Sequence, residues 1–219
     1  MIRRYHPNYQ KLFEQYGANA AGMVSSFSNT VVERMIEAFS NWHFNLVIEG
    51  TGRTAEVPRS TAELLAGKGY TVELAVIAAR PEMSLVSTLL RFYQINERGT
   101  IPRATATSAH DVVVDTLPGN LDALWRESQI SRITIGDRER QILYDSASDR
   151  SAPSIILREY WDREWSVEEQ EMAQAQIDRL YEMELRENLG RTALIQEAER
   201  RVAAVVQREE LSQGLEMDF

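Results

Sequence analysis

The stretch NLVIEGTGRTAEVP, residues 45–58, joins an apolar run of strand length, a turn with two glycines and the start of a helix. Glycine permits backbone conformations that other residues avoid, so Gly50 and Gly52 predict a sharp turn or a close approach to a ligand. Many phosphate-binding loops connect a strand to a helix in this way. The stretch therefore fits either a phosphate cradle or another wall of a ligand site.

A Walker-type phosphate loop has a definite spacing, GxxxxGK followed by Ser or Thr, in which the lysine neutralises phosphate and the hydroxyl binds magnesium. The chain has one Gly-Lys pair, Gly67-Lys68, and a glycine follows it. That pattern is typical of a turn that ends a helix. Arg53 can still contact an anion, because its guanidinium matches phosphate or carboxylate, but the stretch alone does not predict a site for a nucleoside triphosphate.

The composition limits the class of protein. With 219 residues, 43% of them hydrophobic, the chain is long enough to bury a core. The net charge of -9 argues against broad nucleic-acid binding, which needs a surplus of basic residues. No apolar run is long enough for a membrane span, and there is no cysteine for a disulfide or a thiolate metal site. We expect a cytoplasmic protein without nucleic-acid or membrane partners.

Segments with strand patterns alternate with segments of helical period along the first 149 residues. We expect strands at 44–49 and 71–78, followed by a hairpin in which SRITI and QILYDS flank GDRER. The expected helices are 8–17, a longer one that contains Val24 to Ala38, 57–66, 82–96, and 107–128 with an interruption at Pro118 and Gly119. This order predicts an α/β fold with a mainly parallel sheet, helices on both faces and ligands at the carboxyl ends of the strands.

The region from 150 to 219 differs from the first 149 residues, because it carries most of the negative charge and only helical signals. Ser166 and Glu169 form a capping-box pattern, and Gly190 is expected to end one helix before Thr192 begins the next. We therefore expect a core at 1–149 and an acidic helical extension at 150–219. The extension fits a helical hairpin packed on the core, a partner surface or an oligomer contact.

Several charged residues allow two interpretations. Arg91 lies beside the apolar stripe of the helix at 82–96, and Arg103 lies in the turn-rich segment GTIPRAT. Both fit solvated surface charges as well as anion ligands. Glu33 is equally ambiguous, since it falls away from the apolar stripe of its helix. The three histidines are too few and too irregularly spaced for a metal-site signature.

Six segments together resemble the zeta toxin family. They are HPNYQKL at 6–12, NLVIEGTGRT at 45–54, VP at 57–58, LLAGKGY at 64–70, RAT at 103–105 and AHDVVV at 109–114. LPGNLDAL and the closing hairpin continue the resemblance to about Ser146, and the tail beyond 150 does not share it. The resemblance implies a P-loop kinase of bacterial toxin–antitoxin systems, which uses ATP and Mg²⁺ to phosphorylate the sugar of UDP-N-acetylglucosamine and so impairs cell-wall precursor synthesis.

The resemblance also implies roles for single residues. The pocket for the sugar nucleotide would be lined by His6, Glu33, Thr51, Arg53 and Thr61. Glu49 would lie near the reacting centre. Arg91 and Arg103 would face the ATP phosphates and stabilise charge during transfer, which suits a reaction that depends on positioning and on cations.

The chain departs from the family pattern before the HP motif. Zeta toxins have there a strand, a phosphate loop, a helix and a second strand that ends in the aspartate general base, whereas this chain begins at Met1, five residues before His6. The general-base aspartate is therefore expected upstream of Met1, together with the first two strands of the sheet. We expect the 219 residues alone neither to bind ATP well nor to catalyse transfer.

Three explanations stay open. They are a kinase whose sequence starts late, a chain completed by a separate N-terminal piece that pairs with an exposed sheet edge, and a non-catalytic remnant that binds UDP-N-acetylglucosamine or a partner. We take the first as the working interpretation, which an in-frame upstream translation tests. A small antitoxin is a further expected partner. The attacked hydroxyl and the oligomeric state stay open.

Overall fold

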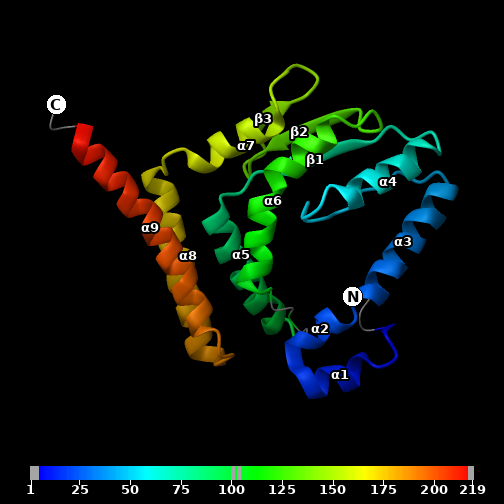
Figure 1. Ribbon diagram of the computed structural model, residues 1–219. Coiled ribbons are helices and arrows are strands. Elements are labelled where there is room, and N and C mark those ends of the chain that lie inside the picture. Colours follow the sequence, from blue (N-terminus) through cyan, green and yellow to red (C-terminus); the bar gives the residue numbers. More distant parts are fainter. Residues whose placement is uncertain (1–4, 100–101, 103–104, 217–219) are drawn as a thin grey trace.

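The computed structural model describes residues 5–99, 102 and 105–216. In Figure 1 the helices α1 to α3 form one arm, the sheet lies at the top with α4, α6 and α7, and α8 and α9 form the other arm. The helices are α1 Tyr9–Tyr16, the short 3₁₀ turn η2 Gly17–Asn19, α2 Ala20–Met23, α3 Ser25–Asn41, α4 Glu56–Ala66, α5 Pro81–Glu97, α6 Thr107–Trp125, α7 Pro153–Asp162, α8 Val167–Glu187 and α9 Thr192–Glu216.

The described strands form one small mixed sheet. Strand β1 (Glu73–Ile77) pairs in parallel with β2 (Arg132–Gly136), and β2 pairs antiparallel with β3 (Ile142–Asp145), with an irregularity between Ile135 and Gly136. The buried residues of this layer come from the strands and from α6 and α7. They include Ala78, Leu121, Leu124, Ile133, Ile135, Tyr144 and Leu157. The α/β class is confirmed, and the sheet is mixed where a mainly parallel one was expected.

The predicted strand at 44–49 is wrong, because residues 44–50 form no strand in the structure. A strand is defined by hydrogen bonds to a neighbour, and no described strand lies beside this segment. Its apolar side chains consequently stay in solvent: Val47 is 95% exposed and Phe44 is 55% exposed. One face of β1 is also uncovered, since alternate residues of the strand are exposed and Ile77 is 72% exposed. Helices therefore do not cover both faces of the sheet at β1.

The predicted interruption at Pro118 and Gly119 is also wrong, because α6 is continuous through both residues. Proline removes one helical hydrogen bond and normally costs several kcal/mol inside a helix. Here Pro118 is buried, and Leu121 and Leu124 on the following turn lie in the core of the sheet layer. Packing of α6 against the sheet thus offsets the local cost.

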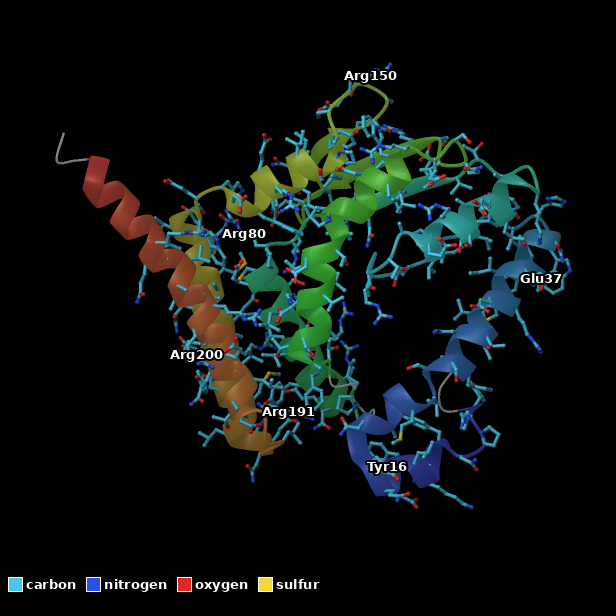
Figure 2. All side chains as sticks on the ribbon, viewed as in Figure 1. Tyr16, Glu37, Arg80, Arg150, Arg191 and Arg200 are labelled. Atoms are coloured by element: carbon cyan, nitrogen blue, oxygen red, sulfur yellow. The ribbon has the colours of Figure 1, made fainter. Side chains whose placement is uncertain are left out.

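A buried arginine connects the sheet to the helices that follow it. Arg80 is 3% exposed and stands between the end of β1 and the first turn of α5. Its Nη1 donates to the carbonyl oxygens of Trp161 (3.1 Å) and Arg163 (2.7 Å), and its Nη2 donates to that of Glu164 (2.8 Å). These are the last carbonyls of α7 and of the turn before α8, where Figure 2 places Arg80. Burial lowers the pKa of Arg80.

The segment beyond 150 packs on the rest of the chain. The predicted capping box of Ser166 and Glu169 is present. Helix α8 ends at Glu187 with Asn188 as its C-cap, slightly before the expected Gly190. The apolar faces of α8 and α9 share one buried cluster with α5, which includes Tyr93, Ile177, Leu180, Ile195 and Ala198. The division at residue 150 stays a prediction, and the tail acts as an intramolecular brace on α5.

Glu184 fixes the turn of this helical hairpin. Its carboxylate is 7% exposed and accepts hydrogen bonds from the Tyr93 hydroxyl (2.8 Å) and from the backbone N–H groups of Leu189 (3.0 Å) and Arg191 (2.7 Å). Burial raises the pKa of Glu184, and the hydrogen bonds from Tyr93 and the two amides outweigh burial, so that the net pKa is lowered. The ionised form is therefore the one that the fold stabilises.

We predict that Glu184→Gln lowers the free energy of unfolding by about 2 kcal/mol at pH 7, because buried N–H groups lose a charged acceptor. Since the folded pKa lies below the ordinary 4.5, this stabilisation is present above about pH 4.5 and is lost as the pH falls through the folded pKa. Urea unfolding of the original protein and of Glu184→Gln, at pH 7 and at pH 3.5, measures the loss of stability and its dependence on pH. Equal stability loss at the two pH values would contradict the assignment to the carboxylate.

Candidate functional site

The glycine turn after residue 49 lies against α6. Gly52 has a φ of +68°, a conformation that favours glycine. A Cβ atom added to Gly52 would come within 2.6 Å of the Leu117 Cδ1 atom. The positive φ therefore favours glycine at this position, and the close approach of the turn to α6 would make the Leu117 side chain shift if a Cβ were added.

Two side chains of α6 hold the turn through its backbone. Asn120 Nδ2 donates to the carbonyl oxygen of Gly52 (2.8 Å), and the single hydroxyl proton of Thr116 is shared between the carbonyl oxygens of Arg53 (2.9 Å) and Val112 (2.7 Å). Because both bonds go to carbonyls, the side chains of Thr51 and Arg53 stay exposed and available to a ligand. Asn120 lies within the LPGN string of the family resemblance. Its hydrogen-bond partner Gly52 lies 68 positions earlier in the chain, so the sequence alone did not reveal this contact.

Helix α4 continues from this turn. Arg59 Nε donates to Glu127 Oε1 (2.7 Å) and so joins α4 to the end of α6. The hydroxyl of Thr61 is half-buried and donates to the carbonyl oxygen of Val57 (2.9 Å). Its lone pairs are still free to accept a hydrogen bond from a ligand.

Lys68, which the sequence places in a helix-ending turn, also caps another helix. Its Nζ donates to Ser40 Oγ (2.7 Å) and Asn41 Oδ1 (2.8 Å) at the carboxyl end of α3. Tyr70 adds hydrogen bonds from its hydroxyl to the carbonyl oxygens of Ser40 (3.2 Å) and Phe44 (2.9 Å). These contacts set the direction of α3 relative to α4, which is a positioning role that no local pattern revealed.

Three further predicted residues lie before α1, on α3 and after α3; they are His6, Glu33 and Glu49. His6 packs edge-on against Phe27 with ring centroids 5.1 Å apart, and its Nδ1 accepts a hydrogen bond from the Asn8 backbone N–H (3.2 Å). Glu33 is exposed on α3, and Glu49 is exposed on the extended segment before the glycine turn. His6 thus has a packing role whether or not it binds a ligand.

Two positions named from the family resemblance lie outside the described residues. One is Arg103, which was expected to face the ATP phosphates, and the other is Met1, upstream of which the general-base aspartate was expected. Both assignments therefore stay predictions.

Arg91 is exposed on α5. Among the residues with described positions, no hydrogen bond or ion pair joins two of the predicted site residues directly. In Figure 1, α3 and α4 lie on one side of α6 and α5 lies on the other, toward α8. The structure thus distributes the predicted residues over separate elements and does not assemble them into a closed pocket.

A cavity of about 350 Å³ lies elsewhere, between α5, α6, α7 and α9. Its wall includes Val114, Arg158, Trp161 and Val205, and none of the predicted site residues lines it. The Nε1 atom of Trp161 is buried without a hydrogen-bond partner. The glycine turn stays the candidate site, because it presents the exposed side chains of Thr51 and Arg53, and its role in binding a ligand stays a prediction.

Two absences hold for the part of the chain that the structure describes. No three His, Asp or Glu side chains gather to hold a metal ion, and no helix combines the length and apolarity of a membrane span. A magnesium ion is usually bound by one or two carboxylates together with substrate phosphates.

The glycine turn, its anchoring by α6 and the arginine on α5 can now be compared with known proteins. A sequence model of the family described as Zeta toxin matches residues 1–149. The chain is also 39% identical over 185 residues to a protein named Toxin PezT from Streptococcus pneumoniae serotype 4, and it covers 72% of that protein. This chain belongs to the zeta toxin family.

Other members of the zeta toxin family agree with this assignment. A protein named Toxin zeta from Streptococcus pyogenes is 36% identical over 164 residues, which are 74% of this chain and 56% of that protein. A solved structure titled as the PezAT chromosomal toxin–antitoxin system of Streptococcus pneumoniae superimposes with a TM-score of 0.73 at 36% identity, covering 83% of this chain and 72% of the other. The chain spans about half the length of the zeta toxin that it matches.

We predict that Gly52→Ala destabilises the protein by about 1–2 kcal/mol, because alanine is strained at positive φ and its Cβ meets Leu117. Gly50→Ala is the matched control, since a Cβ at Gly50 meets nothing within 4 Å and its φ is not positive. Urea unfolding of both variants measures the difference. If the two variants unfold at the same urea concentration, the proposed docking of the turn on α6 is wrong.

Proposed function

We propose that this zeta toxin family member is a sugar-nucleotide kinase, which transfers a phosphoryl group from ATP to a hydroxyl of the sugar of UDP-N-acetylglucosamine. We also propose that it is the toxin of a toxin–antitoxin pair and that a small antitoxin protein is its partner. The family membership and the name of the PezAT system support these proposals. The observation that carries the substrate assignment is the glycine turn, whose carbonyls are held by α6 while Thr51 and Arg53 stay exposed.

The turn suits a diphosphate with an attached sugar. Arg53 presents a planar guanidinium that donates to two oxygens of a phosphate at once. Thr51 adds a hydroxyl that donates to and accepts from a sugar or phosphate oxygen. Because the backbone of the turn is fixed on α6, little conformational freedom is lost when a ligand binds. In the proposal Thr61 and Glu33 contact the remaining polar groups of the sugar nucleotide, and His6 helps to line the pocket.

Phosphoryl transfer depends on positioning the two substrates and on spreading negative charge. In the proposal Arg91 and Arg103 contact the phosphates of ATP and stabilise the charge on the transferred group. Glu49, one residue before the glycine turn, lies near the reacting hydroxyl. No GxxxxGK[ST] loop occurs within the 219 residues, and no described carboxylate cluster fits Mg²⁺, so no step is assigned to the metal.

We predict that Arg53→Ala weakens the binding of UDP-N-acetylglucosamine to the 219-residue chain by about tenfold or more, because a charge-assisted hydrogen bond to phosphate contributes roughly 1.5–3 kcal/mol. Isothermal titration calorimetry measures the affinity. Arg126→Ala is the control, since Arg126 is another exposed arginine, at the C-cap of α6. Unchanged affinity of Arg53→Ala would remove the substrate assignment of the turn.

A second prediction concerns the rate. In a form of the protein that includes a phosphate loop, Arg91→Gln should lower kcat by about a hundredfold or more and leave the affinity for UDP-N-acetylglucosamine within about twofold of the original. The measurement is the mass increase of the sugar nucleotide by one phosphate, followed over time. A loss of substrate affinity with an unchanged kcat would contradict the role of Arg91.

A further inference from the structure

Helix α5 has two opposite faces with different chemistry. One face is apolar and packs on α8 and α9 through the cluster that contains Val86, Leu89 and Tyr93. The other face carries polar residues spaced alternately by three and four positions, which keeps them on one side of a helix. These residues are Ser84, Ser87, Arg91, Gln94 and Arg98. No carboxylate belongs to this set.

The glutamates of α5 lie on the side of the tail. Glu97 pairs with Arg186 of α8, and Glu82 lines the cavity between α5 and α9. In a chain with a net charge of -9, a helix face with two arginines, two serines and no carboxylate is an unusual concentration of hydrogen-bond donors and positive charge. We call the set Ser84, Ser87, Arg91, Gln94 and Arg98 the polar face of α5.

A third arginine reaches the polar face of α5 from the sheet. Arg138 stands in the turn between β2 and β3, and its Nη1 donates to Ser87 Oγ (3.0 Å). Ser87 in turn donates to the carbonyl oxygen of Met83 (2.7 Å), so its hydroxyl is fixed when it accepts from Arg138. Arg91 follows Ser87 by one helical turn, which brings the Cβ atoms of 87 and 91 to about 6 Å from each other.

The β2–β3 turn is well defined by its own hydrogen bonds. The Asp137 backbone N–H donates to the carbonyl oxygen of Gln141 (3.0 Å), and the Gln141 backbone N–H donates to Asp137 Oδ1 (2.8 Å). The turn follows the carboxyl end of β2, and β1 ends at the same edge because the two strands are parallel. Ligands of α/β sheets bind at this edge. Arg138 therefore lies where an anionic ligand is expected.

Ion pairs with carboxylates do not explain why the arginines of α5 and of the β2–β3 turn lie together. Within the described residues, neither Arg91, Arg98 nor Arg138 has a carboxylate within ion-pair distance, whereas Arg163, Arg186 and Arg201 on the tail all have one. Like charges held together on one surface repel each other, and a bound polyanion would offset that repulsion. The grouping thus points to a ligand with several negative charges.

We propose that Arg138, positioned by Ser87, binds the phosphate chain of the phosphoryl donor together with Arg91. This inference rests on the proposed kinase function and adds a residue from the β2–β3 turn to the donor side of the site. The polar face of α5 and the turn form one phosphate-binding surface, and the glycine turn on α6 forms the surface for the acceptor. Arg138 contacts the donor, and Ser87 is a positioning residue that acts through Arg138.

The direct test is titration of the 219-residue chain with inorganic tripolyphosphate at low ionic strength, followed by calorimetry or by NMR shifts. Arg138→Gln should weaken binding by about tenfold, since one charge-assisted contact is lost, and Arg91→Gln should weaken it similarly. The matched control is Arg150→Gln, which removes the same charge from the loop before α7, at the outer edge of the molecule in Figure 2. It should change the affinity by less than about twofold, because a distant surface charge is screened.

A second pair of variants separates positioning from bulk charge. Ser87→Ala keeps every arginine but removes the acceptor of Arg138, and we expect about threefold weaker binding with a nearly unchanged unfolding midpoint. Ser87→Thr keeps the hydroxyl and should restore the affinity. If Arg138 only ties the turn to α5, Arg138→Gln and Ser87→Ala will lower the unfolding midpoint and leave tripolyphosphate binding unchanged, and the inference is then wrong.

Two further outcomes test whether the surface binds polyphosphate specifically and whether this binding is separate from the proposed kinase reaction. Sulfate at equal ionic strength should bind far more weakly than tripolyphosphate, and equal affinities would mean nonspecific anion binding and overturn the inference. Because tripolyphosphate binding needs no turnover, the result is independent of the kinase assay. Loss of UDP-N-acetylglucosamine phosphorylation with intact, Arg138-dependent tripolyphosphate binding would reject the proposed substrate and keep the phosphate surface.

Discussion

The buried guanidinium of Arg80 is the contact on which the remaining arrangement depends. It stands where β1 becomes α5, and it satisfies three carbonyl oxygens at the end of α7 and before α8. A buried arginine is costly unless its charge and donors are compensated. Here the three carbonyls accept from Nη1 and Nη2, and the Glu169 carboxylate lies 3.5 Å from Nε, which makes no hydrogen bond of its own. Through this one side chain the sheet, α5 and the tail are joined, and α5 carries the predicted donor-binding arginine as well as the cluster that holds α8 and α9.

The proposed site has two walls that are built on neighbouring helices. Helix α6 holds the glycine turn through Thr116 and Asn120 and leaves Thr51 and Arg53 exposed. The polar face of α5 lies toward the β2–β3 turn, and its opposite, apolar face packs against α8 and α9 of the tail. The acidic tail of this zeta toxin family member thus has a mechanical role, because it fixes the helix that carries Arg91. Asp111 of α6 adds to this brace through its ion pair with Arg201 of α9 (2.6 Å).

Features with local causes were predictable from the sequence, and features with distant partners were not. The capping box at Ser166 depends on residues three positions apart, and it was predicted correctly. The predicted strand at 44–49 is wrong, because an apolar pattern alone does not make a strand and no described strand pairs with this segment. The predicted interruption at Pro118 is wrong, because the packing of α6 against the sheet offsets the local cost of proline. The family resemblance predicts Arg53 and Thr51 as site residues, and that prediction is still to be tested. The contacts that hold the backbone of this turn, and the contact of Arg138 with Ser87, join residues more than 50 positions apart, so no local pattern revealed them.

The central claim is that one buried arginine joins the α5 side of the site to the tail as a cooperative unit. Arg80→Lys tests it most directly, because lysine keeps the charge and cannot donate to the three carbonyls in the same geometry. We predict a single urea transition with an unfolding free energy lower by about 2–4 kcal/mol, and faster amide hydrogen exchange in both α5 and α8. An unfolding free energy within about 0.5 kcal/mol of the original protein, or faster exchange confined to α7, would contradict the account.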